Sequence, residues 1–162
     1  MAIDSLTQAQ IEELIACQKQ VERPHVRTRQ DGRHTRRDFD AHSADGRHEF
    51  VVFTRQSTVI PQSFSAGLRW RSKTGEDVIL VRCNGSDHEH FNAIEAQKFT
   101  GQCHVHMATE RYAAAGRKIE SFARPDKGYR TLDGARHSLT QLAHITGLDT
   151  KPDELDLFID TP

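Results

Sequence analysis

Four of the ten histidines in the chain fall within residues 88–106, where they form two H-x-H pairs, His88/His90 and His104/His106. Imidazole is a common ligand for transition metals and also gains or loses a proton near neutral pH. On a β-strand, residues two apart point to the same face, with their side chains about 7 Å apart. The spacing therefore predicts that His104 and His106 act together, either on a metal ion or in proton transfer. A binding role for the four rings without chemistry also remains open.

The first hypothesis is metal-independent acid–base catalysis on a phosphodiester. His104 and His106 would form the acid–base pair, one ring taking the proton of a 2′-hydroxyl and the other protonating the leaving oxygen. His90 and Tyr112 would be further catalytic groups. Cationic side chains would neutralise the phosphate, so that no cofactor is needed. The expected substrate-binding residues are Arg36, Arg37, Arg82, Asn92 and Arg111.

The alternative hypothesis is a zinc-type, metal-dependent hydrolase. A catalytic zinc ion takes three protein ligands and keeps a fourth position for water. Three of the four clustered histidines could supply these ligands, as could two of them with a carboxylate. The candidate ligands are His88, His90, His104 and His106, with Glu89 and Glu95 as the nearby carboxylates.

An antiparallel meander must position these residues. Two segments of alternating hydrophobicity flank a turn containing Gly46, and two more flank a turn containing Gly75, a pattern typical of β-hairpins. The segment CHVHMA then predicts a short fifth strand. Its cysteine, valine and methionine would face the core, and its two histidines would face the opposite side.

Helices are expected at both ends of the meander. Ser5 and Gln8 have the spacing of a capping box, which predicts a helix over about residues 5–20. A second amphipathic segment predicts a helix over about residues 131–145, with Gly147 after its C-terminus. We therefore expect an α+β fold, in which an antiparallel β-meander of about five strands lies between an N-terminal and a C-terminal helix.

Length and charge suggest how the chain is organised. A chain of 162 residues suits one domain, here residues 1–148. Residues 149–162 would form an acidic C-terminal tail, with five acidic residues and one lysine, whereas residues 19–37 carry seven Lys or Arg and two acidic residues. This asymmetry predicts a basic surface for an anionic partner. The tail could imitate nucleic acid or cover the basic surface in a homodimer.

The cysteines and the first residues bear on location. The three cysteines are an odd number with no C-x-x-C pair, which favours reduced thiols in the cytoplasm. The segment MAIDSLTQAQ has neither the basic nor the apolar region of a signal peptide. No apolar run approaches the about 20 residues that cross a bilayer, so we expect a cytoplasmic protein without a membrane partner.

Three segments, RRDF, LVRCNGSDHEHFN and CHVHMATERY, resemble a family of small uncharacterised bacterial and phage proteins. That family carries an arginine pair on an early strand, an arginine-bearing strand before an H-x-N turn, and an H-[IV]-H strand followed by an aromatic residue. The resemblance covers about residues 34–124. The H-[IV]-H strand is also similar to one in small toxin–antitoxin-associated proteins, and this likeness implies RNA as a partner.

Three functions follow from the sequence as hypotheses. The first is a small phosphodiesterase or ribonuclease that cleaves RNA or cyclic oligonucleotides by histidine acid–base catalysis without a cofactor. The second is the zinc-type hydrolase that uses the two H-x-H pairs. The third is a non-enzymatic nucleotide- or RNA-binding module or a phage anti-defence protein.

Overall fold

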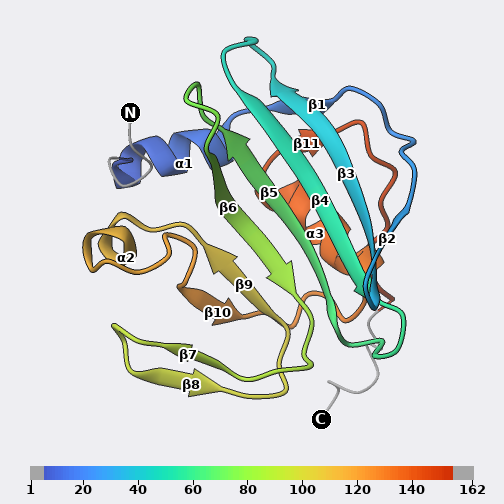
Figure 1. The fold of residues 1–162 in the computed structure, drawn as a ribbon, viewed down its shortest axis with the longest axis vertical. Helices are drawn as coiled ribbons and strands as arrows, with labels where there is room; N and C mark the ends of the chain where they lie inside the picture. The colour runs from blue at the N-terminus through green and yellow to red at the C-terminus, as the bar shows by residue number, and fades with distance from the viewer. Residues whose placement is uncertain (1–5, 155–162) are drawn as a thin grey trace.

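The structure, a computed structural model, describes residues 6–154. Three helices and eleven strands follow one another along these residues (Figure 1). The helices are α1 (Gln8–Ala16), α2 (Glu110–Ala114) and α3 (Leu132–Leu142). The strands are β1 (Lys19–Val21), β2 (Arg29–Asp31), β3 (His34–Ser43), β4 (Glu49–Ser57), β5 (Phe64–Arg71), β6 (Asp77–Asn84), β7 (His90–Asn92), β8 (Gln97–Phe99), β9 (His104–Met107), β10 (Ala123–Pro125) and β11 (Ile145–Thr146).

Nine strands form one sheet in the order β10-β9-β6-β5-β4-β3-β1-β11, with β2 paired to β3. All neighbours are antiparallel except β1 and β11. The expected meander is present as β3 to β6, and its turns contain Gly46 and Gly75 with positive φ. The expectation of about five strands was too low. The additional strands have two or three residues each, too few for an alternating pattern to separate them from loops.

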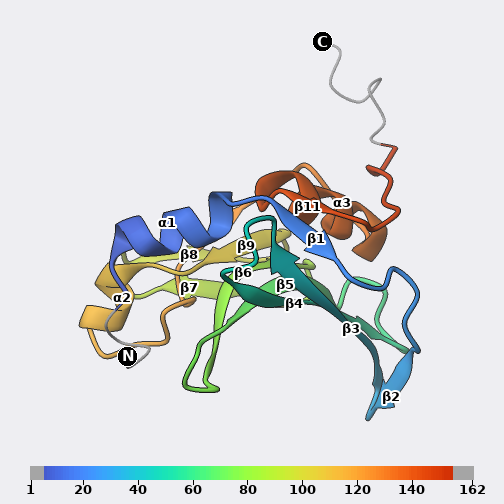
Figure 2. The ribbon, with the colours of Figure 1, turned by 90° about the horizontal axis from the view of Figure 1, so that it is seen from above.

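The two faces of the sheet differ in character. Helices α1 and α3 lie on the same face (Figure 2), and the core is packed between these helices and the sheet. Alternation places Phe50 and Val52 of β4 in this core, while Arg55 of the same strand belongs to the opposite face. That opposite face, termed here the open face, carries the polar residues of β6, Arg82 and Asn84, and the histidines of β9.

A glycine on β5 is required by the packing of the open face. A Cβ atom on Gly67 would lie 2.2 Å from the ring of Phe53 on β4, far inside van der Waals contact. The guanidinium of Arg69 in turn lies 5.3 Å from the centre of this ring. On the open face, the ring of Phe53 is thus packed between the backbone of Gly67 and the guanidinium of Arg69.

Both flanking helices begin at threonine. In α1 the hydroxyl of Thr7 accepts from the backbone N–H of Gln10, and the Gln10 side chain accepts from the N–H of Thr7, a complete capping box. The expected cap, Ser5, lies outside the described residues, and the helix begins later than expected. In α3 the hydroxyl of Thr131 accepts from the N–H of Gly134. The capping box of α1, formed by Thr7 and Gln10, thus lies two residues after the expected pair of Ser5 and Gln8.

Of the expected acidic tail, residues 149–154 lie within the described part and the remainder lies outside it. The carboxylate of Asp153 accepts hydrogen bonds from the backbone N–H groups of Arg130 and Thr131, at 2.5 and 3.0 Å, and from the Thr131 hydroxyl. An acidic group at the start of α3 also interacts favourably with the helix dipole. This first part of the tail is therefore packed against the domain.

Between Leu6 and Glu154, no helix combines the length and the hydrophobicity that a membrane crossing requires.

Candidate metal centre

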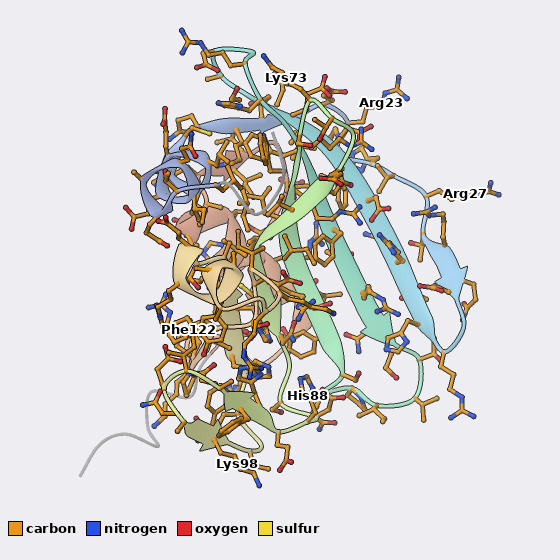
Figure 3. The ribbon with its side chains drawn as sticks, turned by 60° about the vertical axis from the view of Figure 1, so that its left-hand side comes forward. Arg23, Arg27, Lys73, His88, Lys98 and Phe122 are labelled. Carbon is orange, nitrogen blue, oxygen red and sulfur yellow. The ribbon has the colours of Figure 1, made fainter. Side chains whose placement is uncertain are left out.

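Three imidazole rings meet at one end of the open face. His104 and His106 lie on β9 and point to the same side, as their spacing predicts, and His90 reaches them from the β7–β8 hairpin. The ring centres of His90 lie 5.6 Å from His104 and 4.8 Å from His106, and those of His104 and His106 lie 5.1 Å apart. One nitrogen of each ring lies within 4.8 Å of the other two. Figure 3 shows nitrogen atoms gathered beside His88.

Hydrogen bonds define the tautomers of the two β9 histidines. Nδ1 of His104 lies 3.0 Å from the carbonyl oxygen of Gln102, and Nδ1 of His106 lies 2.9 Å from that of Glu120. A carbonyl oxygen can only accept, so both Nδ1 atoms carry the hydrogen. The lone pairs of these two neutral rings are therefore on Nε2. Within residues 6–154, the buried Nε2 of His104 has no hydrogen-bond partner.

The third ring is oriented by a buried asparagine. The Asn92 side chain donates to the carbonyl of Ala123 at 2.6 Å and accepts from its N–H at 2.9 Å, which defines the orientation of the amide. Its Oδ1 lies 2.8 Å from Nε2 of His90, so that Nε2 must donate. His90 is then left with a free lone pair on Nδ1. Every ring of the cluster has one nitrogen bonded to a carbonyl oxygen and one available as a ligand.

Burial keeps the β9 rings neutral. The two residues are 0% and 5% exposed, and loss of hydration lowers the pKa of His104 to about 4 and of His106 to about 3. The nearby charge of Arg82 lowers both pKa values further. Neutral imidazole is the form that binds metals. A general acid must instead be protonated at its working pH, which these environments oppose.

Arg82 is the cation next to the cluster. It pairs with His106 across the β6–β9 ladder, and burial lowers the pKa of its guanidinium. Among the described residues, Arg82 makes no ion pair, and its buried Nε has no hydrogen-bond partner. An arginine whose hydrogen-bonding capacity is unused inside a protein is well suited to an anionic ligand.

His88 lies at the margin of the cluster. Its ring centre is 4.9 Å from that of His104, but it does not belong to the group of three whose nitrogens lie together. Its Nδ1 contacts the carboxylate of Asp87 at 2.9 Å, and about half of its side chain is exposed. The structure thus brings together three of the four clustered histidines.

Tyr112 and Arg111 brace the hairpin that carries His90. The Tyr112 hydroxyl donates to Glu95 at 2.5 Å and accepts from the N–H of Ile94, and Arg111 pairs with the same carboxylate. Burial and the bond to Glu95 raise the pKa of the Tyr112 phenol. These contacts join α2 to the turn between β7 and β8. Glu95 is therefore engaged with α2, and Tyr112 lines a cavity that also contains His90 and His106.

The expected arginine pair on the early strand does not act as a unit. Arg36 and Arg37 are consecutive in β3 and point to opposite faces of the sheet. Arg36 pairs with Asp38 at 3.1 Å, and Arg37 donates to the hydroxyl of Thr28 at 2.8 Å. Only Arg36 is on the open face, where β4 and β5 separate it from β6. Two of the cations expected to share a basic surface, Arg36 and Arg37, therefore lie on different sides of the sheet.

Sequence reasoning missed several parts of the site. The carbonyl oxygens of Gln102 and Glu120 and the backbone of Ala123 leave no mark on a sequence, because any residue type could provide them. Arg55 and Ser65 of the open face, which lie opposite each other on β4 and β5, were also missed. The alternation of residues along β4 and β5 was the signal that could have placed them on the same face as the histidines.

The fold and the site together define a class: an open-faced, mostly antiparallel sheet with helices on one side and three converging histidines at one end of the other. A protein family of unknown function, DUF6978, matches residues 6–144. The chain belongs to this family, in agreement with the expected likeness to uncharacterised proteins. No curated protein and no solved structure matches the chain.

Proposed function

We propose that His90, His104 and His106 bind one transition-metal ion, with zinc as the best match, and that the protein is a metal-dependent hydrolase. The observation that carries the proposal is the arrangement of the three rings: one nitrogen of each lies within 4.8 Å of the others, and each ring also has one nitrogen in contact with a carbonyl oxygen, which leaves its second nitrogen available. Metal-binding histidines characteristically donate their second N–H in this way. When bound to three protein nitrogens, zinc lowers the pKa of a water molecule in its fourth position.

The residues fit a metal better than they fit acid–base catalysis without one. Nε2 of His104 is buried without a partner among the described residues, and such a group is expensive to bury unless a ligand satisfies it. The metal-independent ribonuclease needs one protonated ring, whereas burial of His104 and His106 favours two neutral ones. Cleavage of RNA or a cyclic oligonucleotide, and a likeness to toxin–antitoxin-associated proteins, stay predictions.

The metal content of the full chain tests the proposal. Protein purified without a histidine tag is expected to contain or take up one zinc ion per chain, measured by elemental analysis after dialysis against a weak chelator. A content well below one ion per chain after exposure to zinc, iron, manganese and nickel in turn would contradict the metal centre. Nitrogen-rich sites suit several of these metals, so the comparison also identifies the preferred ion.

The role of Asn92 gives a second prediction. Asn92→Leu keeps the size of the side chain but removes the acceptor for His90 and both contacts with Ala123. We expect metal affinity to fall about 10- to 100-fold, as for other losses of a ligand's hydrogen-bond partner. Asn92→Asp retains an acceptor for His90 and should lose less. Equal zinc affinities of the leucine variant and the unaltered protein in a chelator competition would refute this positioning role.

A further inference from the structure

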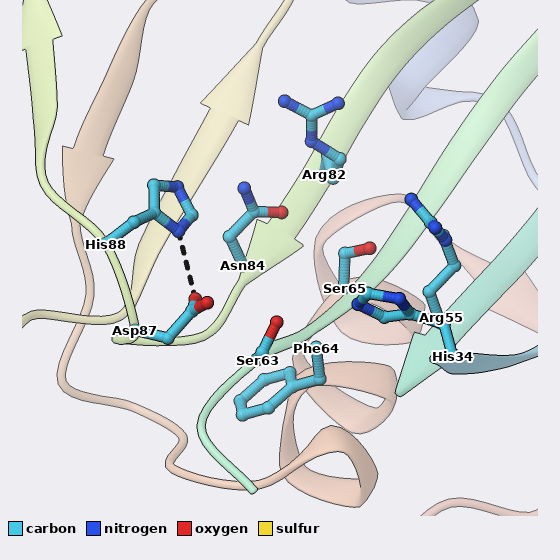
Figure 4. Close-up of a pocket in the computed structure, with 9 residues that line it drawn as sticks. All are labelled: His34, Arg55, Ser63, Phe64, Ser65, Arg82, Asn84, Asp87 and His88. Carbon is cyan, nitrogen blue, oxygen red and sulfur yellow. Dashed lines mark hydrogen bonds and ion pairs between the residues drawn. The ribbon is translucent and has the colours of Figure 1, made fainter. Parts of the chain in front are cut away.

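A second cavity on the open face adjoins the three histidines. It has a volume of about 180 Å³ and lies between the ends of β4, β5 and β6 and the loop after β6. Figure 4 shows His88 and Asp87 on one side of it and His34 and Arg55 on the other, with Arg82 and Asn84 on the strand between them. Arg82 also lines the neighbouring cavity that contains His90 and His106. One guanidinium is therefore shared by the two cavities.

The lining of this cavity is cationic and rich in donors. Arg55 and Arg82 contribute two guanidinium groups against one carboxylate, that of Asp87. The hydroxyls of Ser63 and Ser65 also line it. The carboxylate of Asp87 contacts the ring of His88, and within residues 6–154 it makes no ion pair with either arginine.

Both arginines have donors to spare. Nε of Arg55 and Nε of Arg82 are buried and have no hydrogen-bond partner within residues 6–154. The only ion pair of Arg55 among these residues is with Asp31 at 3.5 Å, which involves a terminal nitrogen. A planar guanidinium matches the oxygens of a phosphate group, and two of them can hold it from two sides. The excess of one positive charge in the lining matches the single charge of a phosphodiester.

We infer that the substrate of the proposed metal centre carries a phosphodiester, whose unesterified oxygens bind in the cavity between Arg55 and Arg82. The inference rests on the proposed function for the chemical step. One water molecule is consumed, and its oxygen forms a bond to phosphorus. The ester P–O bond breaks, and the electron pair of this bond goes to the leaving oxygen. One proton of the water goes to that oxygen and the other to solvent. The guanidinium groups stabilise the charge that develops on the phosphoryl oxygens.

Anion binding by the metal-free full chain tests the cavity separately from the metal. Bis(p-nitrophenyl) phosphate is titrated calorimetrically in the presence of EDTA. Arg55→Gln and Arg82→Gln are each expected to weaken binding at least about tenfold, the usual effect of losing a hydrogen bond to a charged group. Arg47→Gln, at an exposed turn, is the matched control and should bind as the unaltered protein does. Arg55 is partly exposed, so its variant remains informative if the Arg82 variant does not fold.

The outcomes separate the two proposals. Weaker binding by the Arg55 variant, together with zinc-dependent release of p-nitrophenol by the unaltered protein, supports the inference. Equal binding by the Arg55 variant and the Arg47 control overturns it, whatever the zinc content. Tighter binding of p-nitrophenyl phosphate than of the diester also overturns it. If the Arg55 variant loses anion binding, but neither the unaltered protein nor any variant takes up zinc, the hydrolase is refuted and the cavity is an anion-binding site without a metal centre.

Discussion

His104→Gln is expected to abolish tight zinc binding. His104 is fully buried and provides one of the three clustered nitrogens. The N–H at its Nδ1 donates to the carbonyl oxygen of Gln102. Glutamine can still donate to that carbonyl, but it offers no imidazole nitrogen. Removing a ligand should reduce affinity by more than the 10- to 100-fold that follows from disturbing a ligand's partner. A chelator competition with a zinc indicator measures the change, and any zinc-dependent hydrolysis should fall with it.

Two matched variants make this prediction specific. His25→Gln changes an exposed histidine remote from the cluster and should leave zinc affinity unchanged. His88→Gln is the sharper control, because its ring lies 4.9 Å from that of His104 and yet outside the group of three. If His88→Gln lost zinc and His90→Gln kept it, the assignment of the three ligands would be wrong.

Lys19→Met is expected to lower the free energy of unfolding by about 3 kcal/mol or more. The ammonium of this buried lysine donates to the carbonyl oxygens of Ile15, Cys17 and Ala143, at 2.8, 2.7 and 2.8 Å. These carbonyls lie at the C-terminal ends of α1 and α3, where a helix leaves its last acceptors unpaired. Methionine has a similar length but cannot donate, so three buried acceptors would lose their partner. Urea unfolding of the full chain measures the difference.

An exposed lysine gives the control for this stability prediction. Lys73 lies in the turn between β5 and β6, and Lys73→Met should change the free energy of unfolding by less than about 0.5 kcal/mol. A Lys19 variant as stable as the Lys73 variant would show that the three carbonyls find other donors. In that case, Lys19 would not hold the ends of the two helices together.

The parts of the fold that follow a local period could be predicted, and the parts that depend on distant contacts could not. Alternation was enough to place β3 to β6 and to put His104 and His106 on one face. It could not show that Asn92 would bond to Ala123, 31 residues away, and so bring His90 to the same place. The sequence placed Lys19 in the basic segment of residues 19–37. No local pattern shows that this lysine is buried between the C-terminal ends of α1 and α3.

The same division applies to the site. The sequence pointed to the two H-x-H pairs, but it could not choose among the four rings. That choice depends on the loop after β6, which places Nδ1 of His88 against Asp87 and leaves this ring outside the group of three. The partner of each ring is a carbonyl oxygen, and its identity follows from tertiary packing alone.

The origin of His90 has a consequence for how a metal would act on the molecule. His104 and His106 belong to the large sheet, whereas His90 belongs to the separate β7–β8 ribbon. An ion bound by all three histidines would cross-link the two sheets, so metal binding would also stabilise the position of the β7–β8 ribbon against the large sheet. Metal affinity and the stability of that contact would then be thermodynamically linked.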